Sequence, residues 1–161
     1  MEFMTGMKKQ ETLEIRELLA ADMIGKTVKV NGAVHSVNDC GAVTFVILRK
    51  REGLLQCIYE KGKTDLDLRL LREGTTLELT GMLEKDERAP KGIEIRIQQA
   101  KILSEPQEAM PLPISKWKMN TSLDAKLNYR SISLRNIRER SKFKLQEGIV
   151  RGFRDFLYSQ E

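Results

Sequence analysis

The stretch from Lys26 to Glu60 constrains the fold more than any other part of the chain. β-Branched and aromatic residues fill its runs, and turn-forming residues fill two short gaps, Asn38–Gly41 and Lys50–Gly53. This pattern predicts a β-meander of consecutive strands joined by tight turns. We expect its three strands at about Thr27–Val37, Ala42–Lys50 and Leu54–Glu60. Gly32 lies in the middle of the first run and indicates a bend or bulge of the kind that a small closed barrel needs.

Further strands and short helices complete the expected domain. The alternation of apolar and polar residues predicts strands at Thr75–Leu83 and at about Ile93–Leu103. Apolar residues near helical spacing predict short helices at Glu11–Met23 and Asp65–Arg72. Five short strands with a helix between the third and the fourth match an OB-fold, a Greek-key barrel. The expected fold class is therefore mainly β.

The composition changes beyond Ser104. Three prolines, Pro106, Pro111 and Pro113, predict a stiff linker over residues 105–122. Apolar residues at helical spacing then predict an amphipathic helix at Ile137–Tyr158, whose long apolar stripe needs a partner. We expect a leader of vector origin at residues 1–7, the barrel at 8–104, the linker, and a third segment at 123–161.

Several classes of function find little support in the composition. No apolar run approaches the roughly 18 residues that span a bilayer, and the N-terminus lacks a signal-peptide core, so we expect a cytosolic protein. Cys40 and Cys57 are isolated, and His35 is the single histidine, so we predict no metal site and no nucleophile–base pair. The net charge of +5 is a weak indication of an anionic partner.

An OB barrel binds oligonucleotides across its second and third strands, which directs attention to three residues. Phe45 offers a ring on which an unpaired base can stack, and Gln56 offers a donor and an acceptor to a base edge. Glu94, on the polar face of the fifth strand, accepts only and selects a base edge that presents an N–H. The expected phosphate contacts are Arg49, Lys50, Arg51, Lys85 and Arg88.

Plainer interpretations stand beside this one. A lone phenylalanine in a strand is more often a core residue, and Gln56 and Glu94 fit solvated strand positions equally well. The residues Lys50–Glu52 also suit a charged hairpin tip. The pattern alone does not decide between nucleic-acid binding and these plainer interpretations.

Residues Gly32 to Gln56 resemble the anticodon-binding barrel of class IIb aminoacyl-tRNA synthetases, in the aspartyl and asparaginyl branch. The shared features are Gly32, Val34-His35, the Asp39–Gly41 turn, Phe45, Leu48-Arg49, Arg51-Glu52-Gly53 and Gln56. The loop from Asp86 to Glu94 is similar to the connection before that family's fifth strand. The segments Leu112–Ile114 and Leu127–Arg135 resemble the approach to a class II catalytic domain. Phe143–Leu157 resembles the opening helix of motif 1, the dimer-interface element.

The resemblance implies tRNA recognition. In the family, the residue that matches Phe45 stacks on the central uridine of the anticodon, and those that match Gln56 and Glu94 hydrogen-bond to anticodon bases. One departure is Asn38, where the family commonly has arginine, which puts the strictness of anticodon reading in question. Lys50 stands where aspartate is frequent and adds positive charge.

The same resemblance implies an aspartate–tRNA ligase that uses ATP and Mg²⁺ and acts as a homodimer in the cytoplasm. The ATP and amino-acid sites of the family lie in motifs 2 and 3, beyond Glu161, so we expect no catalytic residue and no cofactor in this chain, which should be inactive alone. An asparaginyl-tRNA synthetase fragment remains an alternative, as does a free-standing OB protein that binds single-stranded nucleic acid. In a third alternative, the barrel has lost RNA binding and serves only assembly.

Overall fold

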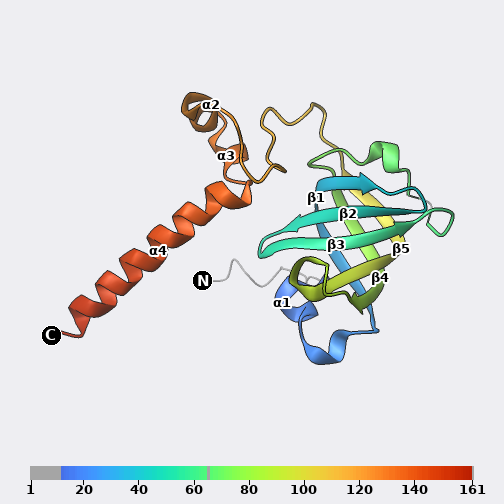
Figure 1. The fold of residues 1–161 in the computed structure, drawn as a ribbon, viewed down its shortest axis with the longest axis horizontal. Coiled ribbons are helices and arrows are strands. Elements are labelled where there is room, and N and C mark those ends of the chain that lie inside the picture. The colour runs from blue at the N-terminus through green and yellow to red at the C-terminus, as the bar shows by residue number, and fades with distance from the viewer. Residues whose placement is uncertain (1–11, 65, 161) are drawn as a thin grey trace, which may run out of the picture. The chain divides into compact units, whose positions relative to one another are not determined.

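The first part of the chain folds into a closed five-stranded β-barrel, which confirms the expected fold class (Figure 1). The computed structural model describes residues 12–64 and 66–160. The strands are β1 (Thr27–Asp39), β2 (Val43–Lys50), β3 (Gly53–Glu60), β4 (Thr76–Lys85) and β5 (Ile93–Ser104). Around the barrel they run β1-β2-β3-β5-β4, and only the β3–β5 pair is parallel. The chain divides into two compact units, one ending at Ala109 and the other beginning at Met110.

Alternation along the strands directs apolar side chains into the barrel. Every second residue is buried in one core cluster, whose members include Val30, Val46, Leu48, Leu55, Cys57, Leu77, Leu79 and Ile95. Burial raises the pKa of the Cys57 thiol, because the thiolate would lose its hydration there. The residues between these positions therefore form the outer surface of the barrel.

The helices of the barrel are shorter than the sequence predicts. In place of one helix over Glu11–Met23, the described residues form α1 (Ile15–Leu18) and the 3₁₀ turn η1 (Ala21–Met23), while Glu11 lies outside the described residues. Ile15 and Leu18 are nevertheless buried in the core. Of the helix expected at Asp65–Arg72, the described residues form a single 3₁₀ turn, η2 (Leu68–Leu70), and Asp65 lies outside the described residues. Another 3₁₀ turn, η3 (Pro90–Gly92), leads into β5.

Strand β1 changes partners and then slips by one residue. Up to Ala33 it pairs with β4, and from Ala33 onward it pairs with β2, so Gly32 lies at the predicted corner. The register shift itself falls between Val34 and Ser36, beyond the position that Gly32 suggested. After the shift, Asn38 pairs with Phe45, so both residues lie on the outer surface.

A second register shift, between β4 and β5, requires a glycine because a side chain has no room there. The β4–β5 register shifts between Thr80 and Gly81. A Cβ atom added at Gly81 would lie 2.2 Å from the carbonyl oxygen of Arg96 and 2.8 Å from Ile95 Cγ2. Only glycine allows the two backbones to approach this closely.

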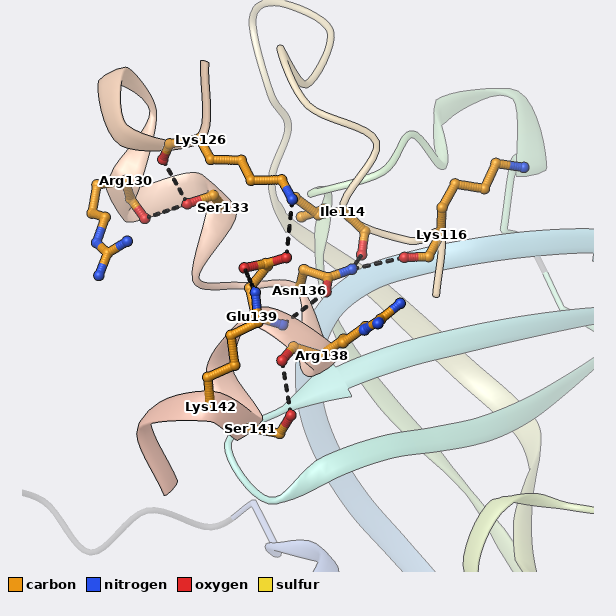
Figure 2. A network of polar contacts seen from close by, with 10 residues as sticks. All are labelled: Ile114, Lys116, Lys126, Arg130, Ser133, Asn136, Arg138, Glu139, Ser141 and Lys142. Atoms are coloured by element: carbon orange, nitrogen blue, oxygen red, sulfur yellow. Dashed lines mark hydrogen bonds and ion pairs between the residues drawn. The ribbon is translucent and has the colours of Figure 1, made fainter. Parts of the chain in front are cut away.

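The second unit contains α2 (Leu123–Asn128), α3 (Arg130–Ser133) and α4 (Ile137–Tyr158), the last with the predicted bounds. Figure 2 shows the polar network at the start of α4. The buried Asn136 side chain accepts from Glu139 N at 3.1 Å and donates to the carbonyl oxygens of Ile114 at 2.9 Å and Lys116 at 2.7 Å. One side chain therefore caps α4 and ties the preceding segment to it.

Candidate nucleic-acid interface

The outer faces of β2, β3 and β5 form one continuous surface, which we call the reading face. Because side chains alternate along a strand, the outward residues of neighbouring strands lie in rows across the sheet. One row consists of Asn38, Phe45, Ile58 and Arg96. The adjacent row consists of Ser36, Ile47, Gln56 and Glu94. The three residues singled out in the sequence therefore lie together.

Phe45 belongs to the reading face and not to the core. Its neighbours in sequence, Thr44 and Val46, are buried inside the barrel, whereas Phe45 is half-buried and pairs with Ile58 on β3. The largely buried Ile58 and Ile47 support it from the same side of the sheet. An aromatic ring on a rigid, partly exposed sheet can stack on an unpaired base.

Gln56 and Glu94 form a hydrogen-bonded pair next to this ring. The Gln56 Nε2 atom donates to Glu94 Oε2 at 2.9 Å, because the parallel register of β3 and β5 sets the two residues side by side. Glu94 is 5% exposed, and Gln56 is half-buried. The bond fixes the amide orientation and leaves the Gln56 Oε1 acceptor and a second amide N–H for a ligand.

Arg96 is a member of the reading face to which the sequence analysis gave no role. Its guanidinium group donates to Glu84 at 3.0 Å from Nε and 2.9 Å from Nη2, and it also contacts Glu60. The Arg96 hydrogen bond holds the pKa of Glu84 below its usual range, and the two carboxylates raise the pKa of Arg96. The signal in the sequence was a pair of opposite charges, Glu84 and Arg96, on outward positions of β4 and β5.

Asn38 stands at the opposite end of its row from Arg96. It is exposed, and the following residue, Asp39, accepts from Gly41 N at 2.9 Å and so holds the β1–β2 turn. The shift in β1 is what turns Asn38 outward, and the strand periodicity alone gave no sign of it.

The predicted phosphate contacts are distributed unevenly. Arg49 lies half-buried on the outer side of β2, and Arg51 is exposed in the β2–β3 turn. Arg88 is exposed at the β4–β5 loop, where Asp86 holds it through Nε at 3.2 Å and Nη2 at 3.0 Å. Lys85 is exposed at the end of β4. These cations gather at the end of the reading face where β3 and β5 begin.

Lys50 does not reach the reading face. It points into the barrel, where its side chain is 1% exposed, and Nζ donates to the carbonyl oxygen of Asn31 at 2.8 Å and lies 3.5 Å from Glu14 Oε1. An ammonium group bound in this way is closed to a phosphate. We therefore leave Lys50 out of the site proposed below.

Three further observations concern metal ligands, membrane-spanning helices and the distribution of charge. Within residues 12–64 and 66–160, no cluster of three or more His, Cys, Asp or Glu side chains could hold a metal ion. In the same ranges, no helix is both long and apolar enough to cross a membrane. Acidic and basic side chains nearly balance over residues 1–109, and the excess of Lys and Arg lies in residues 110–161. The reading face thus offers stacking and hydrogen bonding at its centre, with cations at the end where β3 and β5 begin.

A closed five-stranded barrel with this strand order defines an OB-fold, an architecture that binds oligonucleotides across its second and third strands. Residues 28–103 match the tRNA anticodon family, described as an OB-fold nucleic acid binding domain. The expected relationship to aspartyl- and asparaginyl-tRNA synthetases is confirmed by the relatives that follow.

Two curated relatives are each named aspartate–tRNA(Asp/Asn) ligase. The one from Saccharolobus solfataricus is 33% identical over 136 residues, which cover 83% of this chain and 31% of the relative. The one from Deinococcus radiodurans is 33% identical over 133 residues, covering 83% of this chain and 29% of the relative. The chain therefore spans about a third of the length of these curated relatives.

Solved structures support the same fold. The structure of asparaginyl-tRNA synthetase from Pyrococcus horikoshii, complexed with asparaginyl-adenylate, matches with a TM-score of 0.76 and 22% identity. The match covers 93% of this chain and 35% of the synthetase. It extends beyond the barrel into the second unit.

Proposed function

We propose that the barrel reads the anticodon of a tRNA through the reading face. The observation that carries the proposal is the Gln56–Glu94 hydrogen bond of 2.9 Å on the same outer surface as Phe45, in a barrel that matches the tRNA anticodon family. A base stacked on the Phe45 ring presents its Watson–Crick edge to neighbouring amide and carboxylate groups. Glu94 rejects base edges that present only acceptors, because it is itself an acceptor.

Arg49, Arg51 and Arg88 are the proposed phosphate contacts of this site, with Lys85 beside them. They lie at or beside the outer face, at the end where the hairpin turn and the β4–β5 loop meet. Arg88 keeps free guanidinium N–H groups beyond its contact with Asp86, since arginine has five. Asn38, at the other end, is the proposed contact whose short neutral side chain reaches a base or sugar without adding charge.

We further propose that the chain is part of an aspartate–tRNA ligase that charges both tRNA(Asp) and tRNA(Asn). The curated relatives carry this double specificity in their names. Asn38, where the resemblance leads us to expect arginine, is consistent with a less strict reading of the anticodon. The intact enzyme would use ATP and Mg²⁺ at sites outside this chain and would act in the cytoplasm. Exposed apolar residues along α4, such as Phe143, Ile149 and Phe153, support a homodimer.

Two alternative assignments are an asparaginyl-tRNA synthetase and a free-standing OB protein. An asparaginyl-tRNA synthetase has the same barrel, and the Pyrococcus horikoshii structure supports the shared fold. A free-standing OB protein has no need of the second unit, which the match to the full-length synthetase includes. We therefore favour the synthetase and, from the names of the curated relatives, aspartate as its amino acid.

The proposal is tested by binding this chain to RNA stem-loops that carry GUC, GUU or CUU, at one fixed moderate salt concentration. We expect GUC and GUU to bind comparably and both to bind better than CUU. Phe45→Ala should weaken GUC binding by roughly 5- to 150-fold, the equivalent of about 1–3 kcal/mol of stacking. Phe45→Leu, which keeps the apolar bulk and lacks the ring, is the matched variant and should lose nearly as much.

Two results would contradict the proposal. If all three stem-loops bind equally and Phe45→Ala changes nothing, the reading face does not read an anticodon. If GUC binds far better than GUU, the double specificity is wrong, and the anticodon-reading part of the proposal stands.

A further inference from the structure

A polar hollow of about 500 Å³ lies beside the reading face, on the outer surface of β4 and β5. It exists because β3 and β5 pair only over Gln56–Ile58 and Glu94–Arg96, after which β5 continues alongside β4 alone. The turn after β3 folds back across the gap, and Thr64 Oγ1 donates to the carbonyl oxygen of Ile97 at 3.4 Å. The hollow is thus bounded by the residues after β3 on one side and by the two long strands on the other.

The side chains that line the hollow suit a nucleotide. Lys63 and Lys101 lie at its edge, and Thr64, Thr80 and Gln98 provide hydroxyl and amide groups. The carboxylate in the lining, Glu78, is already bound by Lys29 Nζ at 3.2 Å. Lysines next to neutral hydrogen-bonding groups are typical of contacts to the phosphates and sugars of RNA.

A chain of ion pairs connects the hollow to the reading face. Lys63 contacts Glu60, Glu60 contacts Arg96, and Arg96 lies in the row of Phe45 and Ile58. Arg96 lies two strands from Phe45, and the first residue of β5 in the lining, Gln98, follows Arg96 by two positions. Because Glu60 contacts Lys63 and Lys29 contacts Glu78, these charges offset one another, and Lys101 adds a further positive charge to the lining.

We propose that the hollow binds the phosphate and the ribose of a nucleotide that flanks the base stacked on Phe45. Lys63 and Lys101 contact the phosphate, and Gln98 contacts the ribose hydroxyl. The RNA strand then runs from the cations at the β2–β3 turn, across the reading face, to a second group of cations at the hollow. This inference rests on the proposed function, since it assumes that RNA occupies the reading face.

The first experiment measures binding of the GUC stem-loop by Lys63→Gln and Lys101→Gln across a series of salt concentrations. Each variant should bind roughly 3- to 10-fold more weakly, and each should lower the slope of log affinity against log salt by about 0.7. Lys61→Gln is the matched control, because Lys61 is an exposed lysine of the same turn and does not line the hollow. The melting temperature of each variant shows whether loss of the Lys63–Glu60 contact has disturbed the fold.

A second experiment locates the contact on the RNA. Each stem-loop in a series carries one uncharged methylphosphonate at a different position. When the methylphosphonate lies next to the stacked base, we expect Lys101→Gln to cause no further loss of affinity. A 2′-deoxy substitution at the same nucleotide should likewise cancel the effect of Gln98→Ala.

The outcomes separate the two proposals. If Phe45→Ala weakens binding while Lys63→Gln and Lys101→Gln behave like Lys61→Gln, the hollow holds no nucleotide and this inference is wrong. If the lysine effects add to every methylphosphonate substitution, the lysines act from a distance and the inference is also overturned. If Phe45→Ala has no effect, the proposed function itself fails.

Discussion

The side-chain amide of Gln56 donates to Glu94 Oε2 at 2.9 Å across the parallel pair of β3 and β5. Glutamine can present either its oxygen or its nitrogen to a ligand, and a neighbouring carboxylate removes that freedom because it accepts only. The pair therefore behaves as one recognition group with a defined donor and acceptor pattern.

Glu94→Gln is the first prediction, because it keeps the shape of the pair and removes its charge. Hydrogen bonds to charged groups contribute about 1.5–3 kcal/mol, so affinity for the GUC stem-loop should fall roughly tenfold or more. The preference over CUU should narrow, since the new amide offers both a donor and an acceptor. Glu105→Gln, an exposed carboxylate just beyond β5 that belongs to neither the reading face nor the hollow, is the control for loss of one carboxylate. Unchanged affinity and preference in Glu94→Gln would show that this pair takes no part in reading.

Lys50→Ala should affect stability and leave RNA affinity alone. The substitution removes the donor to the Asn31 carbonyl oxygen and leaves Glu14 without its buried partner. We expect the free energy of unfolding to fall by about 1–3 kcal/mol in denaturant titrations. Arg51→Ala, at the neighbouring position, should leave the free energy of unfolding unchanged and reduce the salt dependence of RNA binding. An RNA defect in a folded Lys50→Ala protein would refute the buried assignment.

Gly81→Ala should destabilise the barrel. The new Cβ would meet the Arg96 carbonyl oxygen at 2.2 Å, so β4 and β5 must separate where they pair most closely. Overpacking of this kind costs about 1–3 kcal/mol or more, visible as a lower denaturation midpoint. Gly148→Ala is the control, because a Cβ at Gly148 has open space in α4. Equal stability of Gly81→Ala and wild type would mean that the β4–β5 register differs from the one described.

The acid side of the stability profile should depend on Glu84. The Arg96 hydrogen bond lowers its pKa from the usual 4.5, so its contribution is fully present above that pH and is lost as the pH falls through the lower folded-state pKa. Glu84→Gln should therefore reduce the loss of unfolding free energy between about pH 5 and 3. Glu87→Gln, which removes an exposed carboxylate of the next loop, is the matched variant. Parallel profiles for wild type and Glu84→Gln would argue against the ion pair.

Asn136→Ala should loosen the start of α4. It removes the acceptor for Glu139 N and the donors to the Ile114 and Lys116 carbonyl oxygens. Loss of an N-cap side chain costs about 0.5–2 kcal/mol. Hydrogen exchange at the first-turn amides of α4 should quicken, whereas Asn128→Ala, whose amide contacts Asp124 on the surface, should leave it unchanged. If hydrogen exchange is unaltered in Asn136→Ala, Asn136 does not stabilise the start of α4.

The strands could be predicted from the sequence because their signal is local. Alternation along β2 and β3 placed Phe45 and Gln56 on the same outer surface, and it remains valid in the structure. The same alternation puts Lys50 inward with Val46 and Leu48. The prediction that Lys50 contacts a phosphate was based on its charge and ignored this inward position in the strand. A lysine is rarely buried without partners, and here Asn31 and Glu14 are those partners.

The parts that could not be predicted depend on contacts distant in sequence. The leucines near Asp67 have helical spacing, yet they pack on the core from irregular backbone and one 3₁₀ turn. The shift in β1 that turns Asn38 outward depends on pairing with β2. Likewise, no local pattern indicates that β5 pairs with β3, which is what joins Arg96 to the row of Phe45.

The short parallel seam between β3 and β5 also has a consequence for folding. It joins residues 38 positions apart in the chain, and such non-local pairings form late and slowly. Gln56 and Glu94 lie in this parallel pairing of β3 and β5. A chain that has formed its hairpins but has not yet closed its barrel therefore does not bring these two residues together. RNA binding at Gln56 and Glu94 therefore reports that the barrel has closed, and a bound RNA in turn favours the closed state over the open one.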